Sequence, residues 1–207
     1  GGAGGSIYIE TGQLVGTGVI AANGGDAIWN SGGGGGGRVA VYFDENLGFD
    51  MVGATDVSGG SSNNEAGFPG TAIYLQRTAT GHHLTLPTTF RIEEERTLAG
   101  RDCLLPAGAL LEMEGGSLLD LTGHLQAEPG AVVWCRGSNR AAEVVRAWAG
   151  RGVQIRAASM AVEAGAQVTA DGQGYTLNGI FQSGSGPGGG SHGNWYGGGG
   201  GGHGGSG

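Results

Sequence analysis

Four carboxylates in the first third of the chain, Asp44, Glu45, Asp50 and Asp56, come closest to a catalytic pattern. Enzymes that cleave glycosidic bonds use paired carboxylates. Asp44 and Glu45 are adjacent, so on a strand they would point to opposite faces. No Asp-Asp or Asp-x-Asp pair stands beside a histidine or arginine. We therefore predict no enzyme and no catalytic residues, and interpret these groups as loop charges, with a β-helix polysaccharide lyase or glycosidase as the alternative.

The histidines do not form a metal pattern. His82 and His83 are adjacent, while His192 and His203 lie in glycine runs, and no spacing fits a zinc site. The glycine runs are not phosphate loops, because the chain contains no lysine for a Gly-Lys-Ser/Thr motif. We predict no metal site and no cofactor.

Calcium is the one cation that we keep as an alternative. The cluster Glu93–Glu95 and the turns at Asp26 and Asp171 offer carboxylate and carbonyl oxygens, which suit Ca²⁺. The simpler interpretation of Glu93–Glu95, between Arg91 and Arg96, is an exposed strand edge whose charges discourage aggregation.

Large aromatic side chains stand out where they interrupt glycine runs. Trp29 precedes a run of six glycines, and Trp195 and Tyr196 lie within the glycine-rich tail. Each could anchor its loop to the body of the protein, since burial of a large apolar side chain gains about 1.5–3 kcal/mol. The alternative is an exposed platform that binds a glycan or a cell-surface receptor.

The two cysteines, Cys103 and Cys135, fit no CxxC metal motif. Two buried thiols is one interpretation. A disulfide that joins neighbouring layers is the other, and it would require an oxidising compartment.

Composition narrows the class of protein. The net charge of −8 and the absence of lysine argue against nucleic-acid partners and anionic membrane surfaces. No apolar run is long enough to cross a membrane as a helix. Low charge with abundant small polar residues favours an extracellular or cell-surface location.

The chain contains 50 glycines, and they punctuate short alternating strands. In residues 38–43 the side chains of Val39, Val41 and Phe43 would share one face. Ile7 matches Ile73 at a separation of 66, with Val39 between them, which gives a rough period of 33. A fixed period of this size is typical of a solenoid.

Residues 83–135 contain fewer glycines and form short apolar strands cut by Pro-Ala-Gly, Glu-Gly-Gly, Thr-Gly and Glu-Pro-Gly turns. We expect one interior lined by Leu110, Met113, Leu118, Leu119, Leu121, Leu125, Val132 and Val133. Residues 139–149 have a helix-like composition, and a strand is the alternative there.

Residues 153–174 resemble residues 6–26 at an offset of 148, with Ile7 on Ile155 and Leu14 on Val162. We therefore divide the chain into glycine-rich coils (1–80), less glycine-rich coils (81–150) and a second copy of the first type (151–207).

These features together predict an all-β protein, a right-handed parallel β-helix whose glycine runs form side loops. The loops are either mobile or packed as polyproline-II-like helices, because glycine backbones can approach closely.

The strings AQVTADGQGY (166–175), SGGGGGGRVAVYF (31–43) and LPAGALLEMEGGSLLDLTGHL (105–125) resemble the glycine-rich parallel β-helix repeats of large secreted or surface-exposed bacterial proteins. The resemblance implies a right-handed parallel β-helix in an adhesin-like or filament-forming protein. It implies no particular active site.

We expect an extracellular structural repeat protein, a segment of a surface fibre, sheath or adhesin stalk. Neither end of the sequence shows a capping segment, so copies are expected to stack end to end. A module that binds a cell-surface glycan or receptor is the alternative.

Overall fold

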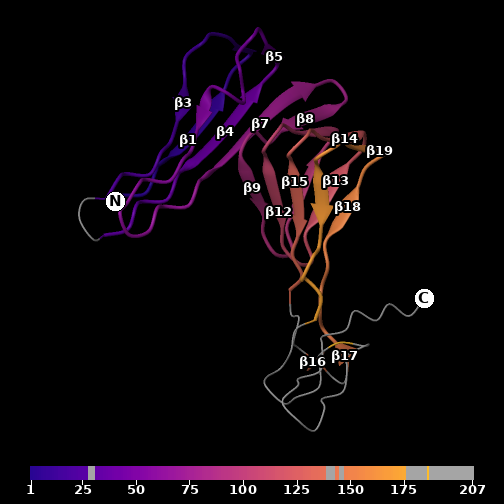
Figure 1. Ribbon diagram of the computed structural model, residues 1–207. Coiled ribbons are helices and arrows are strands. Elements are labelled where there is room, and N and C mark those ends of the chain that lie inside the picture. The colour runs from indigo at the N-terminus through magenta and orange to yellow at the C-terminus, as the bar shows by residue number, and fades with distance from the viewer. Residues whose placement is uncertain (28–30, 139–142, 145–146, 176–185, 187–207) are drawn as a thin grey trace.

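The computed structural model describes residues 1–27, 31–138, 143–144, 147–175 and 186 (Figure 1). The described residues form strands and connecting segments without a helix, and most of the strand pairs are parallel. The prediction of an all-β protein with parallel sheets is therefore confirmed.

The first part of the chain is built from two repeats and the strand that begins a third. Its strands are β1 (Ser6–Glu10), β2 (Gln13–Leu14), β3 (Ile20–Ala21), β4 (Arg38–Phe43), β5 (Glu45–Asn46), β6 (Thr55–Asp56) and β7 (Thr71–Thr78). Each strand pairs in parallel with its equivalent one repeat later, so the pairs are β1–β4, β4–β7, β2–β5 and β3–β6. Val39 lies opposite both Ile7 and Ala72, so the two intervals are nearly equal and close to the expected period.

The predicted period is correct, but the predicted match of Ile7 with Ile73 is wrong by one residue. Ala72 and Tyr74 are the residues of β7 that join Val39 and Val41 in the interior. Ile73 faces the opposite side, where it packs against a second core. A slip of one residue exchanges the two faces of a strand, and here both faces of β7 are apolar.

The glycine-rich segments of this part are ordered and bonded to one another. A relay of backbone hydrogen bonds crosses five of them, from Gly67 to Gly60, Gly34, Gly25 and Gly2, with N···O distances of 2.7–2.9 Å. The expectation of mobile loops is wrong for these segments, because their amide groups are satisfied by neighbouring backbone.

Only glycine fits at two of every three positions in the run of six glycines, Gly32–Gly37. A Cβ on Gly33, Gly34, Gly36 or Gly37 would come within 2.0 Å of a backbone oxygen of a neighbouring segment. A Cβ on Gly32 or Gly35 would stand 3.7 Å from its nearest neighbour. The pattern repeats every three residues, with two positions packed and one open.

A hairpin connects the two parts of the chain. β7 pairs in antiparallel fashion with β8 (Gly81–Thr85), across a turn at Ala79 and Thr80. One seven-stranded sheet, in the order β1-β4-β7-β8-β11-β14-β19, therefore runs through both parts and reverses direction once. The expected boundary between residues 80 and 81 falls at this turn.

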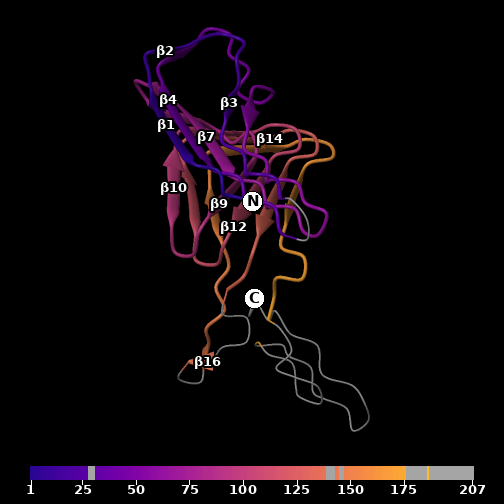
Figure 2. The same ribbon diagram turned by 90° about the vertical axis from the view of Figure 1, so that its left-hand side faces the viewer.

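The second part stacks strands in three sheets (Figure 2). Besides β8 they are β9 (Thr89–Ile92), β10 (Thr97–Gly100), β11 (Asp102–Leu105), β12 (Leu110–Met113), β13 (Leu118–Leu121), β14 (His124–Ala127), β15 (Val132–Cys135), β18 (Gln154–Arg156), β19 (Ser159–Val162) and β20 (Gln167–Thr169). Consecutive strands join different sheets, and each pairs with the third strand before it in the stack. Leu111, for example, lies opposite both Phe90 and Val133, so this stack also repeats regularly, at a shorter interval than the first part.

Turns predicted from the sequence separate these strands. Gly108, Gly116 and Gly130 adopt positive φ values of 78°, 81° and 84°. L side chains rarely adopt such values, so glycine is required at these corners.

An insertion interrupts the stack after β15. It contains β16 (Glu143–Val144) and β17 (Ala147–Trp148), which pair in antiparallel fashion. The helix expected within residues 139–149 is therefore wrong where the structure describes this segment. Because the insertion lies between β15 and β18, the pairs β13–β18, β14–β19 and β15–β20 join residues that are farther apart in the sequence than the earlier pairs of this stack.

β18, β19 and β20 continue the stack, since they pair with β13, β14 and β15. These residues extend the sheets of residues 81–135, an arrangement that their similarity to residues 6–26 did not indicate. The glycine-rich tail of the proposed second copy lies outside the described residues except for Gly186.

Two apolar cores result, and β7 separates them. The first contains Val39, Val41 and Phe43, whose shared face is confirmed by exposures of 2%, 0% and 2%. The second fills the three-sheet stack, and the outward face of β7 packs on it through Leu75 and Ile73.

The predicted interior of the second part is correct in five of eight positions. Met113, Leu119, Leu121, Leu125 and Val133 are buried, whereas Leu110, Leu118 and Val132 are only partly buried. In β12 the buried partner is Leu111, next to Leu110. Because Leu110 and Leu111 are both apolar and adjacent, the sequence does not indicate which of them points inward.

Candidate functional site

The last layer of the stack that the structure describes leaves interior positions exposed. Leu125 pairs with Met160, Ala127 with Val162 and Val133 with Val168. The first member of each pair is fully buried, at 0% exposure. The second members, which continue the same interior columns, are 43%, 45% and 42% exposed. We call Met160, Val162 and Val168 the open end.

The other limit of the seven-stranded sheet is also uncovered. Among the described strands, β1 pairs with β4 alone, so one of its backbone edges is free. Val15 and Val19, in the same first repeat, are 65% and 67% exposed. Uncovered edges and apolar side chains of this kind favour association with another chain.

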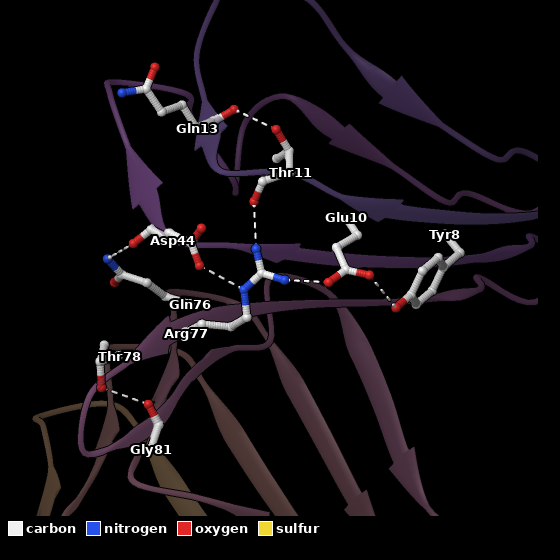
Figure 3. Close-up of polar contacts among 9 residues, drawn as sticks. All are labelled: Tyr8, Glu10, Thr11, Gln13, Asp44, Gln76, Arg77, Thr78 and Gly81. Carbon is white, nitrogen blue, oxygen red and sulfur yellow. Dashed lines mark hydrogen bonds and ion pairs between the residues drawn. The ribbon is translucent and has the colours of Figure 1, made fainter.

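A polar clamp joins the three repeats of the first part (Figure 3). Arg77 of β7 donates to Glu10 Oε1 (2.5 Å), Asp44 Oδ1 (2.7 Å) and the carbonyl oxygen of Thr11 (2.9 Å). The hydrogen bond from Arg77 to Asp44 contributes most to raising the pKa of Arg77 above its ordinary value. One guanidinium thus ties residues from three successive layers.

A second cluster lies on the outer face of the sheet formed by β9, β12 and β15. Arg91 donates through Nε and Nη2 to the nearly buried carboxylate of Glu112, at 2.7 and 2.6 Å. Glu112 lies opposite Trp134, and the Arg136 guanidinium stands 4.9 Å from the centre of a Trp134 ring. This cluster combines a carboxylate, cations and an aromatic ring on one sheet face.

A third polar group follows the strands β8, β11, β14 and β19. His83 Nδ1 lies 3.0 Å from Asp102 Oδ2, and Asp102 Oδ1 accepts the backbone N–H of His124 at 2.6 Å. His124 Nδ1 and Ser159 Oγ are 2.8 Å apart. Each link joins neighbouring strands, so the group acts as a lateral tie between layers.

The carboxylates considered for catalysis do not converge on one site. Asp44 belongs to the clamp, and Glu45 accepts from Gln13 of the adjacent repeat. Asp50 accepts two backbone N–H groups of its own turn, from Val52 and Gly53. Asp56 accepts from Asn23 at 2.7 Å. Their visible chemistry is hydrogen bonding within and between repeats.

The acidic turns considered for calcium make similar bonds. Ser61 donates to Asp26 through its backbone and side chain, and these bonds lower the pKa of Asp26. Glu93–Glu95 were expected on an exposed strand edge, but they follow β9 in a turn. Glu95 forms an ion pair with Arg151. Within the described residues, no three acidic, histidine or cysteine side chains come together as a metal cluster.

The aromatic residues proposed as ligand contacts, Trp29, Trp195 and Tyr196, lie outside the described residues. So do His192 and His203. The structure instead places Tyr8 and Tyr42 side by side on the outward face of β1 and β4, with ring centres 5.4 Å apart. Because the two tyrosines lie close to one repeat apart in the sequence, a search by period could have indicated this contact.

Both cysteines are free thiols in the structure. Cys103 lies in the interior of β11, opposite Leu84 and Leu125, whereas Cys135 ends β15, in a different sheet. Burial raises the pKa of the Cys103 thiol to about 12 and also raises the pKa of Cys135. The disulfide alternative does not describe this structure.

We expect iodoacetamide to modify the folded protein slowly at Cys135 and hardly at all at Cys103, because alkylation requires a thiolate that can reach solvent. Denaturation should make both residues react at similar rates. Mass spectrometry of tryptic peptides after timed labelling measures the two rates. Rapid labelling of Cys103 in the folded state, or recovery of a peptide pair joined by a disulfide, would contradict the arrangement.

The open end and the Arg77 clamp were not found by sequence reasoning. The similarity to residues 6–26 placed Val162 opposite Leu14, but nothing in the sequence says that no described strand covers Met160 and Val162. The partners of Arg77 are 33 and 67 residues away, at one and two repeat lengths, so a search by period would have found them.

No protein-family model, curated protein or solved structure matches this chain significantly. In the part of the chain that the structure describes, there is no helix with the length and apolar character needed to span a membrane.

Proposed function

We propose that the chain is a segment of an extracellular structural protein, a right-handed β-solenoid that forms part of a surface fibre, sheath or adhesin stalk and stacks end to end. The regular recurrence of parallel strands, at one interval in the first part and a shorter one in the second, supports a solenoid. The acidic, lysine-free and weakly charged composition supports an extracellular location.

The glycine-rich segments serve this function as packing elements. Their contact pattern has a period of three, which is the period of a polyproline II helix. We propose that these segments are polyproline-II-like helices packed side by side beside the first sheet. Such a bundle lengthens a solenoid with few side chains, because hydrogen bonds between glycine backbones take the place of an apolar core.

The observation that carries the proposal is the open end. Met160, Val162 and Val168 occupy interior positions, yet each is more than two-fifths exposed. A further layer placed on β18, β19 and β20 would cover them and satisfy the free strand edges. A second copy of this chain is the occupant that we propose.

Light scattering of the purified chain over a range of concentrations tests this proposal. The apparent mass should rise with concentration for the unmodified chain. It should stay near that of one chain when Met160→Asp and Val168→Asp place charges on the open end. Gln167→Asp is the matched control, because Gln167 is exposed on β20 beside Val168 and does not belong to the open end. A constant monomer mass for the unmodified chain up to its solubility limit would refute stacking.

A further inference from the structure

A groove of about 890 Å³ lies where the first part of the protein meets β9. One wall is the outward face of β1, β4 and β7 together with the glycine-rich segments that precede β4 and β7. The other wall is Thr89, Phe90 and Arg91 of β9 together with Glu93, which follows the strand. This volume lies within the range of about 300–1,000 Å³ that is typical of ligand sites.

The β9 wall presents a free backbone edge to the groove. β9 is the terminal strand of the sheet β20-β15-β12-β9 (Figure 1). The carbonyl oxygens of Thr88 and Ile92 accept N–H groups of β12 and of the residue that follows it. Because the hydrogen-bonding groups of a strand alternate in direction, those of Thr89 and Arg91 point to the other side. They are the groups to which a further strand would bind.

Exposed aromatic side chains line the groove opposite this edge. Tyr8 is 67% exposed and Phe68 is 79% exposed, and both lie on the wall away from β9. Phe90, in β9, and Ile73, in β7, are partly buried against the second core and also line the groove. Large apolar side chains that stay this exposed beside a cavity are typical of an interaction surface.

One cation on the wall is not neutralised by any residue that the structure describes. Arg38 is exposed at the start of β4, and no described residue forms an ion pair with it. Arg91, the other arginine of the groove, is already paired with Glu112. Glu93, the acidic residue of the lining, interacts electrostatically with Arg91. Arg38 is therefore the charged group left to select charge in a ligand, and it favours a carboxylate.

We propose that this groove binds an extended peptide segment of a partner protein, which adds to β9 as a further strand. The backbone of the peptide would bond to the outward N–H and C=O groups of Thr89 and Arg91, of which the Thr89 carbonyl oxygen accepts one long hydrogen bond, from Thr88 Oγ1 at 3.5 Å. Its alternate apolar side chains would contact Tyr8 and Phe68, and an acidic side chain would lie near Arg38. A row of backbone donors and acceptors at strand spacing is complementary to a peptide and not to a sugar. This site is independent of the open end and of end-to-end stacking.

Selection from a phage-displayed library of random heptapeptides tests the proposal on the full chain. We expect selected peptides to alternate apolar residues and to carry an acidic residue. Synthetic, fluorescein-labelled copies should bind the unmodified chain and Thr89→Ala equally in a polarisation assay. Thr89→Pro should weaken binding about tenfold or more, because it removes one backbone donor that faces the groove.

The comparison of Thr89→Pro with Thr89→Ala isolates the effect of the backbone N–H group. Proline is tolerated at the first residue of a strand, and Thr89 begins β9. Equal thermal unfolding midpoints for Thr89→Pro and Thr89→Ala show that the sheet is intact. If Thr89→Pro does unfold the sheet, Arg38→Glu provides the second test, and it should reverse the preference of the groove from acidic to basic peptides. Failure to select any binder, or binders unaffected by both Thr89→Pro and Arg38→Glu, would overturn the proposal.

Discussion

Gly34→Ala should strongly destabilise the first part of the protein. The new Cβ would lie 2.0 Å from the carbonyl oxygen of Gly2 and 2.5 Å from its carbon. Both are backbone atoms of a packed segment, so no side chain can rotate away to relieve the clash. Overpacking of this kind costs about 1–3 kcal/mol and sometimes more. The loss of stability should be larger at Gly34 than at a packed glycine outside the hydrogen-bond relay, because the amide and carbonyl of Gly34 both belong to that relay.

Gly35→Ala is the control, one residue away in the same run. Its Cβ would meet only the carbonyl oxygen of Phe68, at the ordinary contact distance of 3.7 Å. We expect it to be neutral or to stabilise by about 0.4–1 kcal/mol, because alanine restricts the unfolded chain. Thermal unfolding followed by circular dichroism compares the variants. Equal midpoints for the two variants would mean that the six glycines form a loose loop and not a packed segment.

This contrast also marks a limit of the sequence. All six residues from Gly32 to Gly37 are the same, so the order of packed and open positions is invisible in the sequence. It is set by the segments on either side, such as those at Gly2 and Gly67, which belong to other repeats. Sequence reasoning could name the polyproline-II-like alternative from glycine's close approach. It could not choose between that and mobile loops, because the choice depends on which neighbours are present.

Strands with one strongly apolar face were predictable. In Arg38–Phe43 the large apolar side chains of Val39, Val41 and Phe43 recur at every second position, and these three are the buried ones. The corners at Gly108, Gly116 and Gly130 were also predictable, because their Pro-Ala-Gly, Glu-Gly-Gly and Glu-Pro-Gly sequences end in glycine, which readily adopts the positive φ of a turn. Both cases depend on local chemistry alone.

β7 shows why the register could not be predicted in the same way. Ala72 and Tyr74 enter one core while Ile73 and Leu75 contact the other. A strand between two cores has no polar face, so the alternation of its side chains does not show which face enters which core. The hairpin to β8 creates the second core, and a similarity search within the sequence does not detect an antiparallel return.

The candidate sites also differ in whether the sequence could have predicted them. The Arg77 clamp is a consequence of the repeat, because stacked layers bring residues one period apart into contact. The open end and the β9 groove are consequences of termination, since each lies at the last described strand of a sheet. Termination is a property of the whole arrangement, and individual residues such as Met160 look like any other interior position.

Leu125→Ala and Met160→Ala, two truncations in one interior column, should have very different costs. Leu125 is fully buried between Cys103 and Met160, and its removal should cost about 2–5 kcal/mol through lost burial and a cavity. Met160 is 43% exposed, so in dilute solution its truncation should cost about half as much or less. Urea unfolding at low protein concentration measures both values.

Protein concentration then separates an open end from a covered one. If a second copy buries Met160, association stabilises the folded chain, and that gain grows with concentration by mass action. Met160→Ala should lose this gain, so its apparent cost should rise toward that of Leu125→Ala as concentration increases. The cost of Leu125→Ala should stay nearly constant, because that site is complete within one chain. A cost for Met160→Ala that already equals that of Leu125→Ala in dilute solution would mean that the column is closed within a single chain, and the open end would then not be the surface that joins copies.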